Sequence, residues 1–356
     1  MLWLLGAAAL GAATPDWEKV SRSPELSFPR DHGAHFSYRT EWWYLTGIVR
    51  EKSGTELGYQ MTIFRRGIDP AASSPGQSAL RARHMLAGHF AVADVAGKRL
   101  VHAQRLRRVD GQLGVASEKD LCVQLESWEI ERKADGSLSV RAADGEAGVS
   151  IDLQLSPSKA IVAHGEAGLS RKGAEEGNAS VYLSWTRLAT RGTVTVGDRK
   201  LEVSGESWFD HEWGTSQLGP GVVGWDWLGL RLADGRELML YHLRDASGAP
   251  IPQSGGTLVE RDGSARRLSL GDFSMEPIGA WRSERTKANY PTRWRVKIPS
   301  AAIEFEVEPL LADSELDSRA TTGIVYWEGP VRLRGAATGE GYMELTGYAE
   351  SMEKKL

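Results

Sequence analysis

This chain of 356 residues contains one cysteine, Cys122. An internal disulfide therefore cannot form, and a zinc site built from several thiolates is excluded. Cys122 lies in an alternating, strand-like run, which predicts a small core residue rather than a nucleophile. The one basic run, at residues 99–108, is short and the formal net charge is -4, so we expect no nucleic-acid partner.

Several other signals are also missing. No apolar run is long enough to cross a bilayer as a helix. The sequence has no glycine-rich phosphate loop, no dinucleotide-binding fingerprint and no HExxH zinc motif. We therefore expect chemistry that needs no nucleotide, no other cofactor and no metal.

The N-terminus carries the one short apolar run, within residues 1–14, followed by small residues. This pattern resembles the apolar region and cleavage site of a secretory leader, although the basic residues that usually precede it are absent. We expect an exported protein, periplasmic or membrane-associated. The alternative is a disordered apolar N-terminus.

Most of the chain alternates apolar and polar residues with a period of two, and turn residues interrupt the alternation at 197–198, 234–235 and 299–300. That pattern predicts antiparallel hairpins. Helix should be scarce, with short helical pieces expected only at 80–86 and 310–316. Many strands in a chain of this length favour an all-β protein with two antiparallel barrels.

Two hairpins resemble each other. Trp42-Trp43-Tyr44-Leu45, a turn and Glu56-Leu57 are matched by Trp225-Asp226-Trp227-Leu228, a turn and Glu237-Leu238. The match suggests two similar β-domains that each open with an aromatic hairpin, and chance similarity of two hairpins is the alternative.

Acidic residues and a histidine stand among tryptophans in two neighbouring stretches, 207–214 and 224–228. Large rings and acid–base groups seldom crowd together on an ordinary surface strand. We interpret both stretches as the floor and wall of a ligand pocket. The residues concerned are Trp208, Asp210, His211, Glu212, Trp213, Trp225, Asp226 and Trp227.

The face that Asp226 occupies decides its chemistry. On a strand, Asp226 shares one face with Leu228 and Leu230, while Trp225 and Trp227 share the other. If the leucine face is the barrel interior, burial would raise the pKa of Asp226 and make it a general acid. If the tryptophan face points inward, the rings line the cavity and Asp226 is solvated. The sequence leaves both arrangements open.

The consecutive residues Asp210, His211 and Glu212 allow three interpretations. Alternation separates His211 from both acids, which disfavours a shared metal ion. A triad of Ser207, His211 and an aspartate would make a serine hydrolase, but no Gly-x-Ser-x-Gly elbow is present. The remaining interpretation is a structural corner.

Five segments together resemble the CrtC/AttH family, which includes carotenoid 1,2-hydratases and exported proteins described as predicted secreted hydrolases. They occur in the right order between about residues 28 and 350. The segments are YRTEWWY at 38–44, SWFDHEWG at 207–214, GWDW at 224–227, ELMLY at 237–241 and GYMELTGY at 341–348.

The resemblance implies two lipocalin-like antiparallel β-barrel domains, at residues 28–215 and 216–352. It implies a cavity for an elongated hydrophobic ligand, an isoprenoid or lipid. In the hydratase branch it also implies cofactor-free, acid-catalysed addition of water to a terminal double bond. Relatives in the secreted branch are often encoded beside ABC transporter components, so such a transporter is an expected partner. The leader-like N-terminus and His211 make this sequence more similar to the secreted branch than to the hydratase branch.

The first hypothesis is therefore an exported hydratase-type lyase. Asp226 is its acid, and His211, Asp210 and Glu212 position water or a polar head group. We expect the substrate to contact Glu41, Trp42, Trp43, Tyr44, Trp208, Trp213, Trp225, Trp227, Tyr241 and Trp327. The rival hypotheses are a non-catalytic lipid carrier that works with an ABC transporter and a secreted hydrolase that depends on His211.

Overall fold

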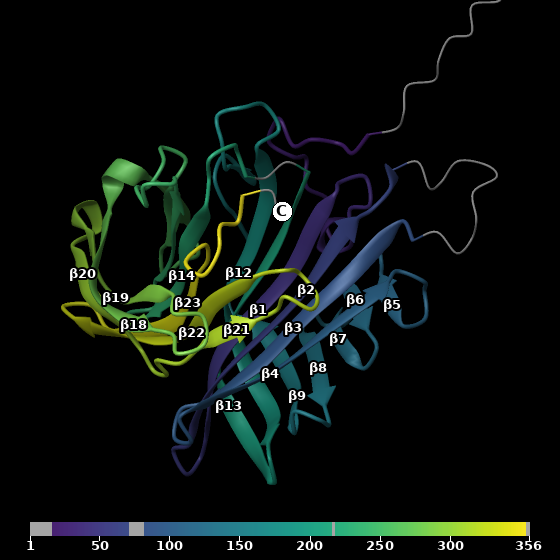
Figure 1. Ribbon diagram of the computed structural model, residues 1–356, viewed down its shortest axis with the longest axis horizontal. Coiled ribbons are helices and arrows are strands. Elements are labelled where there is room, and N and C mark those ends of the chain that lie inside the picture. Colours follow the sequence, from purple (N-terminus) through teal and green to yellow (C-terminus); the bar gives the residue numbers. More distant parts are fainter. Residues whose placement is uncertain (1–15, 71–81, 216–217, 354–356) are drawn as a thin grey trace, which may run out of the picture.

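The computed structural model describes residues 16–70, 82–215 and 218–353. Within them, almost all regular structure is β-strand, arranged as two curled antiparallel sheets that lie side by side (Figure 1). The predicted all-β architecture of two barrel-like sheets is confirmed. Residues 1–14, where the sequence predicts a leader, lie outside the described residues.

The first sheet has 13 strands in the order β4-β3-β2-β1-β13-β12-β9-β8-β7-β6-β5, with β10 and β11 paired to β12. Its strands are β1 (Thr40–Glu51), β2 (Glu56–Gly67), β3 (His84–Asp94), β4 (Arg99–Arg108), β5 (Gly114–Ala116), β6 (Cys122–Leu125), β7 (Trp128–Arg132), β8 (Leu138–Asp144), β9 (Val149–Pro157), β10 (Val162–Ala163), β11 (Leu169–Arg171), β12 (Ala179–Val196) and β13 (Arg199–Gly214).

The second sheet has 10 strands in the order β17-β16-β15-β14-β23-β22-β20-β19-β18, with β21 paired to β22. Its strands are β14 (Gly224–Leu232), β15 (Glu237–Arg244), β16 (Gly255–Val259), β17 (Ala265–Ser269), β18 (Ser274–Arg282), β19 (Asn289–Ile298), β20 (Ile303–Pro309), β21 (Glu315–Asp317), β22 (Val325–Gly335) and β23 (Gly339–Leu345).

Helix is limited, among the described residues, to the short 3-10 turns η1 (Arg30–His32), η3 (Leu270–Asp272) and η4 (Pro299–Ala301). The expected helical pieces are wrong where they can be followed: residues 84–86 belong to β3, and 310–316 form a loop that enters β21. Sheet pairing overrides weak local helix propensity there. No helix in the described part of the chain is long and apolar enough to cross a membrane.

The two similar hairpins occupy equivalent places. β1 lies between β2 and the last strand of its sheet, β13, and β14 lies between β15 and the last strand of its sheet, β23. In both hairpins, alternate residues point into the sheet's own core, Trp43 and Leu45 in one and Leu228 in the other. The intervening residues point toward the other sheet, which explains why these strands are buried on both faces.

Side chains from both sheets form a third cluster between them. Its members are Tyr44, Ile48, Tyr182, Trp208, Trp227, Met239 and Tyr342. The rings of Tyr44 and Trp227 meet edge to face at 5.4 Å between centroids. The tryptophan-rich segments therefore hold the two sheets together, and the inter-sheet boundary is where their polar neighbours are collected.

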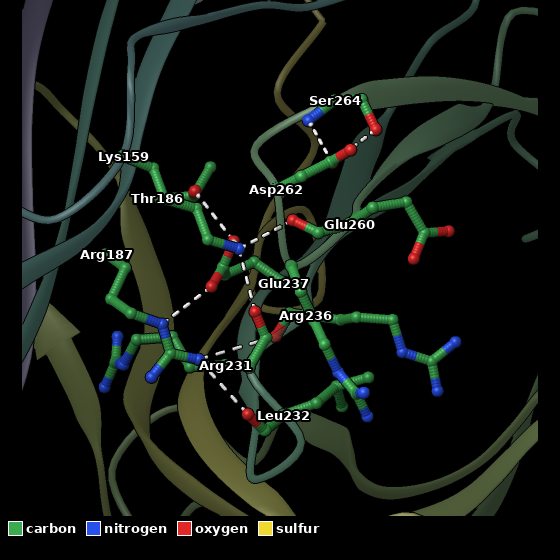
Figure 2. Close-up of polar contacts among 12 residues, drawn as sticks. Lys159, Thr186, Arg187, Arg231, Leu232, Arg236, Glu237, Glu260, Asp262 and Ser264 are labelled. Atoms are coloured by element: carbon green, nitrogen blue, oxygen red, sulfur yellow. Dashed lines mark hydrogen bonds and ion pairs between the residues drawn. The ribbon is translucent and has the colours of Figure 1, made fainter.

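A buried ion-pair network fastens the β14–β15 hairpin to the first sheet (Figure 2). Glu237 is fully buried and accepts hydrogen bonds from Lys159 Nζ at 2.8 Å and Arg187 Nε at 2.6 Å. Arg187 also contacts Glu206 at 2.7 Å, and Lys159 donates to the Gly235 carbonyl at 2.8 Å. Because cations from the first sheet satisfy an acid of the second, this network fixes how the sheets are docked.

Candidate functional site

A cavity of about 110 Å³ lies between the two sheets. We call it the inter-sheet cavity. Its wall consists of Trp42, Tyr44, Thr62, Phe64, Lys172, Tyr182, Asp210, Glu212, Leu218, Trp225, Trp227, Tyr241, Leu243, Tyr326, Glu328 and Glu344. Aromatic side chains from both sheets thus surround four carboxyl groups and one ammonium group.

Asp210, on β13, is the most heavily hydrogen-bonded of these acids. Its Oδ1 accepts from Trp208 Nε1 at 2.5 Å and from the Ser184 hydroxyl, and its Oδ2 accepts from the Tyr182 hydroxyl at 2.7 Å. Burial raises the pKa of Asp210 to about 7, although these three donors favour the ionised form. Asp210 can therefore gain or lose a proton near neutral pH.

A buried histidine fixes the orientation of Ser184. His164 Nε2 lies 2.7 Å from Ser184 Oγ, and Nδ1 lies 2.8 Å from Thr257 Oγ1 of the second sheet. Ser184 gives its proton to Asp210, so its oxygen accepts from Nε2–H and Nδ1 accepts from Thr257. Burial lowers the pKa of His164 to about 3 and keeps the ring neutral. Neither Ser184 nor His164 lines the cavity, so they orient Asp210 rather than contact a ligand.

Two glutamates of the second sheet stand directly opposite each other, Glu328 on β22 and Glu344 on β23. Glu328 Oε2 accepts from Gln60 Nε2 of the first sheet at 2.7 Å, while its buried Oε1 has no hydrogen bond within the described residues. Burial, reinforced by Glu344, holds the pKa of Glu328 well above its usual range, and burial raises the pKa of Glu344 to about 7. The pair therefore retains at least one proton at neutral pH.

The fourth acid, Glu212, has a cationic partner. Glu212 accepts from the Ser180 hydroxyl and lies 3.1 Å from Lys172 Nζ. The Lys172 ammonium also lies 5.0 Å and 4.9 Å from the ring centroids of Tyr182 and Tyr241. Burial opposes the charge on Lys172, but the Glu212 carboxylate outweighs it and raises the lysine pKa. This pair adds a dipole, not a net charge, to the wall.

The structure brings about half of the predicted site residues to this cavity. Those that line it are Trp42, Tyr44, Asp210, Glu212, Trp225, Trp227 and Tyr241. Trp208 stands behind Asp210 as a hydrogen-bond donor. The remaining predicted residues do not line it, and these are Glu41, Trp43, His211, Trp213, Asp226 and Trp327. Strand alternation is the reason, since each neighbours a lining residue in sequence and so points to the opposite face.

Glu41 and His211 belong to a separate buried cluster. Glu41 Oε1 lies 2.8 Å from His35 Nδ1 and 2.9 Å from His211 Nε2, and Arg65 Nε donates to Oε2 at 2.8 Å. Within the described residues, His35, Glu41 and His211 form the one group spaced closely enough to hold a metal ion. Arg65 already neutralises the carboxylate, and the ligand atoms are engaged with one another. We interpret the cluster as structural.

The side chains of Ser207 and His211 are not arranged as a serine hydrolase requires. Ser207 Oγ is buried and bonded to Tyr59 Oη at 2.5 Å and Thr190 Oγ1 at 2.6 Å, while His211 is bonded to Glu41. A nucleophile must lie within hydrogen-bond reach of its base. These two residues therefore do not form the triad that the sequence allows.

Asp226 adopts the first of its two possible arrangements. It lies on the interior face of the second sheet with Leu228, and Trp225 and Trp227 face the inter-sheet cavity from the other side of β14. Its Oδ1 accepts from Tyr348 Oη at 2.7 Å and Arg244 Nε at 3.2 Å. Burial raises its pKa to about 6. Asp226 is thus a buried acid, but it belongs to a different pocket.

Sequence reasoning missed six polar residues of the wall: Thr62, Lys172, Tyr182, Tyr326, Glu328 and Glu344. A signal existed for both glutamates, because Glu328 directly follows Tyr326-Trp327 and Glu344 lies two residues after Tyr342. No local signal marks Lys172 or Tyr182. Tyr182 reaches the cavity through the pairing of β12 with β13, and Lys172 directly follows β11, which pairs with β12.

Comparison with known families gives one extended match. A family model described as AttH-like matches residues 19–348. A crystal structure described as an AttH from Nitrosomonas europaea is 35% identical, with a TM-score of 0.84, and the alignment covers 93% of this chain and 99% of that one. The match thus includes both sheets and every residue of the inter-sheet cavity.

Two more distant relatives have named activities. Kievitone hydratase from Nectria haematococca is 15% identical with a TM-score of 0.67, over 95% of this chain and 98% of that one, which shows a shared fold. The dehydratase asqC of Emericella nidulans is 25% identical over 219 residues, or 60% of this chain. That match spans 59% of the length of the dehydratase.

Proposed function

This chain belongs to the AttH-like family, and on that premise we propose that the inter-sheet cavity is the active site of a cofactor-independent, hydratase-type lyase. One observation carries the proposal: carboxyl groups whose pKa is raised by burial stand in both sheets around an aromatic cavity, Asp210 in the first and the Glu328–Glu344 pair in the second. Relatives named as a hydratase and a dehydratase support it, since hydration and dehydration are one reaction in opposite directions.

The environments of the acids assign their roles. Glu328, whose pKa is held well above its usual range, stays protonated and donates its proton to one carbon of the substrate's double bond. The cation formed at the adjacent carbon is stabilised by the faces of Trp42, Trp225 and Trp227. Asp210, in its ionised form, takes a proton from a water molecule whose oxygen bonds to that carbon. The product is an alcohol, and proton exchange with solvent restores both acids.

The wall chemistry also indicates the substrate class. Rings and aliphatic side chains make up most of the wall, which favours a hydrocarbon such as an isoprenoid or lipid chain. The volume of about 110 Å³ is well below the roughly 300–1,000 Å³ of sites that enclose a whole drug-sized ligand. We infer that the cavity takes the reacting end of an elongated substrate.

The test begins with mass spectrometry of small molecules that co-purify with the protein from its native compartment. The recovered hydrocarbon is then incubated with the protein in ¹⁸O-labelled water. We expect labelled alcohol from the wild type, and none from Glu328→Gln or Asp210→Asn, which should still fold and bind the hydrocarbon. Labelled product at the wild-type rate from both variants would overturn the assignment.

A second candidate function is that of a lipid carrier. The aromatic wall supports it, because binding a lipid requires no catalysed reaction. Binding of the hydrocarbon by the wild type with no label incorporated would favour this carrier. Export and partnership with an ABC transporter are part of the same proposal. Fractionation of the native host, with sequencing of the mature N-terminus, tests export directly.

A further inference from the structure

A second pocket opens at the mouth of the second sheet, on the other side of β14 from the inter-sheet cavity. Its volume is about 540 Å³, within the usual range for small-molecule sites. The pocket borders β18, an edge strand whose register shifts on both sides of Gly279. Such bulges bend a strand away from its partner and open a barrel rim. We call this space the mouth pocket.

Two residues that line the mouth pocket each have one buried side-chain atom that makes no hydrogen bond within the described part of the chain. Asp226 Oδ2 accepts none: Arg244 Nε lies 3.1 Å from it, but the N–H is aimed at Oδ1. Trp294 Nε1 donates none. Both residues line the pocket and are almost fully buried, at 1% and 4% exposure. Buried polar groups are normally paired, so an empty acceptor and an empty donor in one pocket point to a ligand that supplies both.

The charges around the mouth pocket already balance. Arg244 pairs with Asp226, donates through Nη2 to the Thr346 carbonyl, and stacks 4.0 Å from the ring centroid of Tyr348. His242 is neutral, because burial lowers its pKa to about 4. Because this ion pair has no net charge, a carboxylate or ammonium head group would lose its hydration there without gaining a counter-charge. The wall therefore favours a neutral polar group.

The rest of the mouth pocket is apolar. Met275, Pro277 and Pro291 contribute aliphatic surface, and Trp294 contributes a ring. We propose that the mouth pocket is a second binding site, for a hydroxylated hydrocarbon whose O–H donates to Asp226 Oδ2. The alcohol oxygen accepts from Trp294 Nε1 or Arg244, and the hydrocarbon covers the apolar wall. This inference does not depend on the reaction proposed for the inter-sheet cavity.

Three probes with the same chain length test the proposal: 1-octanol, octanoate and octylammonium. Each is titrated calorimetrically at pH 8 into the full chain. We expect 1-octanol to bind at least about tenfold more tightly than either charged probe, because a charged head group would lose its hydration beside an ion pair that has no net charge. Equal affinity for all three probes would mean that only hydrophobic contact is involved and would overturn the proposal.

Variants locate the binding event. Ala280 is exposed and lines the pocket, so Ala280→Trp should block its mouth without entering the core. Ala336→Trp places the same ring on an exposed residue that does not line the pocket, as the matched control. We expect the first variant to lose 1-octanol binding and the second to keep it. Unchanged binding in Ala280→Trp would place the alcohol elsewhere, for example in the inter-sheet cavity, and would refute the site.

Asp226→Asn tests the acceptor itself. An amide nitrogen in the place of Oδ2 cannot accept the alcohol proton, so we expect 1-octanol affinity to fall about tenfold, in line with a lost hydrogen bond to a charged group. Circular dichroism confirms that the variant folds. If it does not fold, Tyr348→Phe, which removes one donor from Asp226 Oδ1, gives a milder perturbation with an expected smaller loss. Undiminished affinity in a folded Asp226→Asn would contradict the proposed contact.

Discussion

Trp227 of the second sheet donates its indole N–H to the hydroxyl of Tyr182 in the first sheet, at 3.0 Å. Tyr182 in turn donates to Asp210 at 2.7 Å. The carboxyl group proposed to activate water is thus held by a hydrogen-bond chain that begins in the other sheet. Neither sheet alone contains the complete site.

A double-mutant cycle should detect this chain. Trp227→Phe removes one buried hydrogen bond and some ring volume, and Tyr182→Phe removes two hydrogen bonds, so each should lower the free energy of unfolding by about 1–3 kcal/mol. Because the two residues share a bond, their effects should not add, with a coupling of about 0.5 kcal/mol or more. Urea unfolding of the four proteins provides the measurement. Strict additivity would show that the bond carries no energy.

Asp210 should make the protein less stable as the pH rises. Its pKa is raised from 3.8 to about 7, so the folded protein holds a proton that the unfolded chain has lost between these values. Stability from this group is therefore full below about pH 4, falls as the pH approaches 7, and is constant above it. Glu344, with a pKa raised from 4.5 to about 7, acts in the same direction.

Asp210→Asn isolates this effect. The Asn amide pairs poorly with the donors that surround Asp210, and this loss of free energy is the same at every pH. It therefore cancels when the stabilities at two pH values are compared. Between pH 5 and pH 8, the stability of the variant relative to the wild type should rise by about 2 kcal/mol. Urea unfolding at both pH values measures it. A difference that does not change with pH would show that Asp210 titrates normally.

Glu237 should be essential to the docking of the two sheets. Glu237→Ala leaves Lys159 and Arg187 without their buried partner, and we expect a loss of about 3–5 kcal/mol in the free energy of unfolding. Glu284→Ala, which breaks an exposed ion pair with Lys287, is the control and should leave stability unchanged. If both variants unfold at the same urea concentration, the network does not stabilise the docking of the two sheets.

The cluster around Glu41 should prove structural. Glu41→Gln leaves Arg65 and His35 facing a neutral amide, and we expect it to destabilise the protein by about 3 kcal/mol or more. Because the ligand atoms already engage one another, zinc should not raise the melting temperature of the wild type. A zinc-dependent rise that disappears in His211→Gln would instead identify a metal site.

His35 gives the same cluster a pH signature. Burial opposes its charge, but hydrogen bonds to Asp31 and Glu41 prevail and raise its pKa above 6.5. Its contribution to stability is therefore full below pH 6.5 and is lost as the pH rises through the folded value. His35→Gln should remove that slope, which urea unfolding between pH 5.5 and 8.5 can follow. An unchanged slope would show that the histidine is neutral in the folded protein.

The sequence by itself determined the strand pattern. Alternation of apolar and polar residues involves only neighbouring positions, and a two-residue turn motif marks each hairpin. It also determined that the two opening hairpins correspond, and it singled out the aromatic-acid stretches that lie between the two sheets. Asp210, Glu212, Trp225 and Trp227 follow from those stretches alone. Glu328 was visible as an acid beside rings, but nothing local gave it a role.

Only the tertiary structure decided which face of each strand meets the other sheet. Alternation separates Asp226 from Trp227 in either arrangement, and only the packing of two curled sheets assigns one face to the core and the other to the cavity. Strand pairing within the first sheet brings Tyr182 to Asp210, His164 to Ser184 and Lys172 to Glu212 from other parts of the chain. Contacts between residues far apart in sequence depend on how whole sheets dock, and local pattern carries no information about that docking.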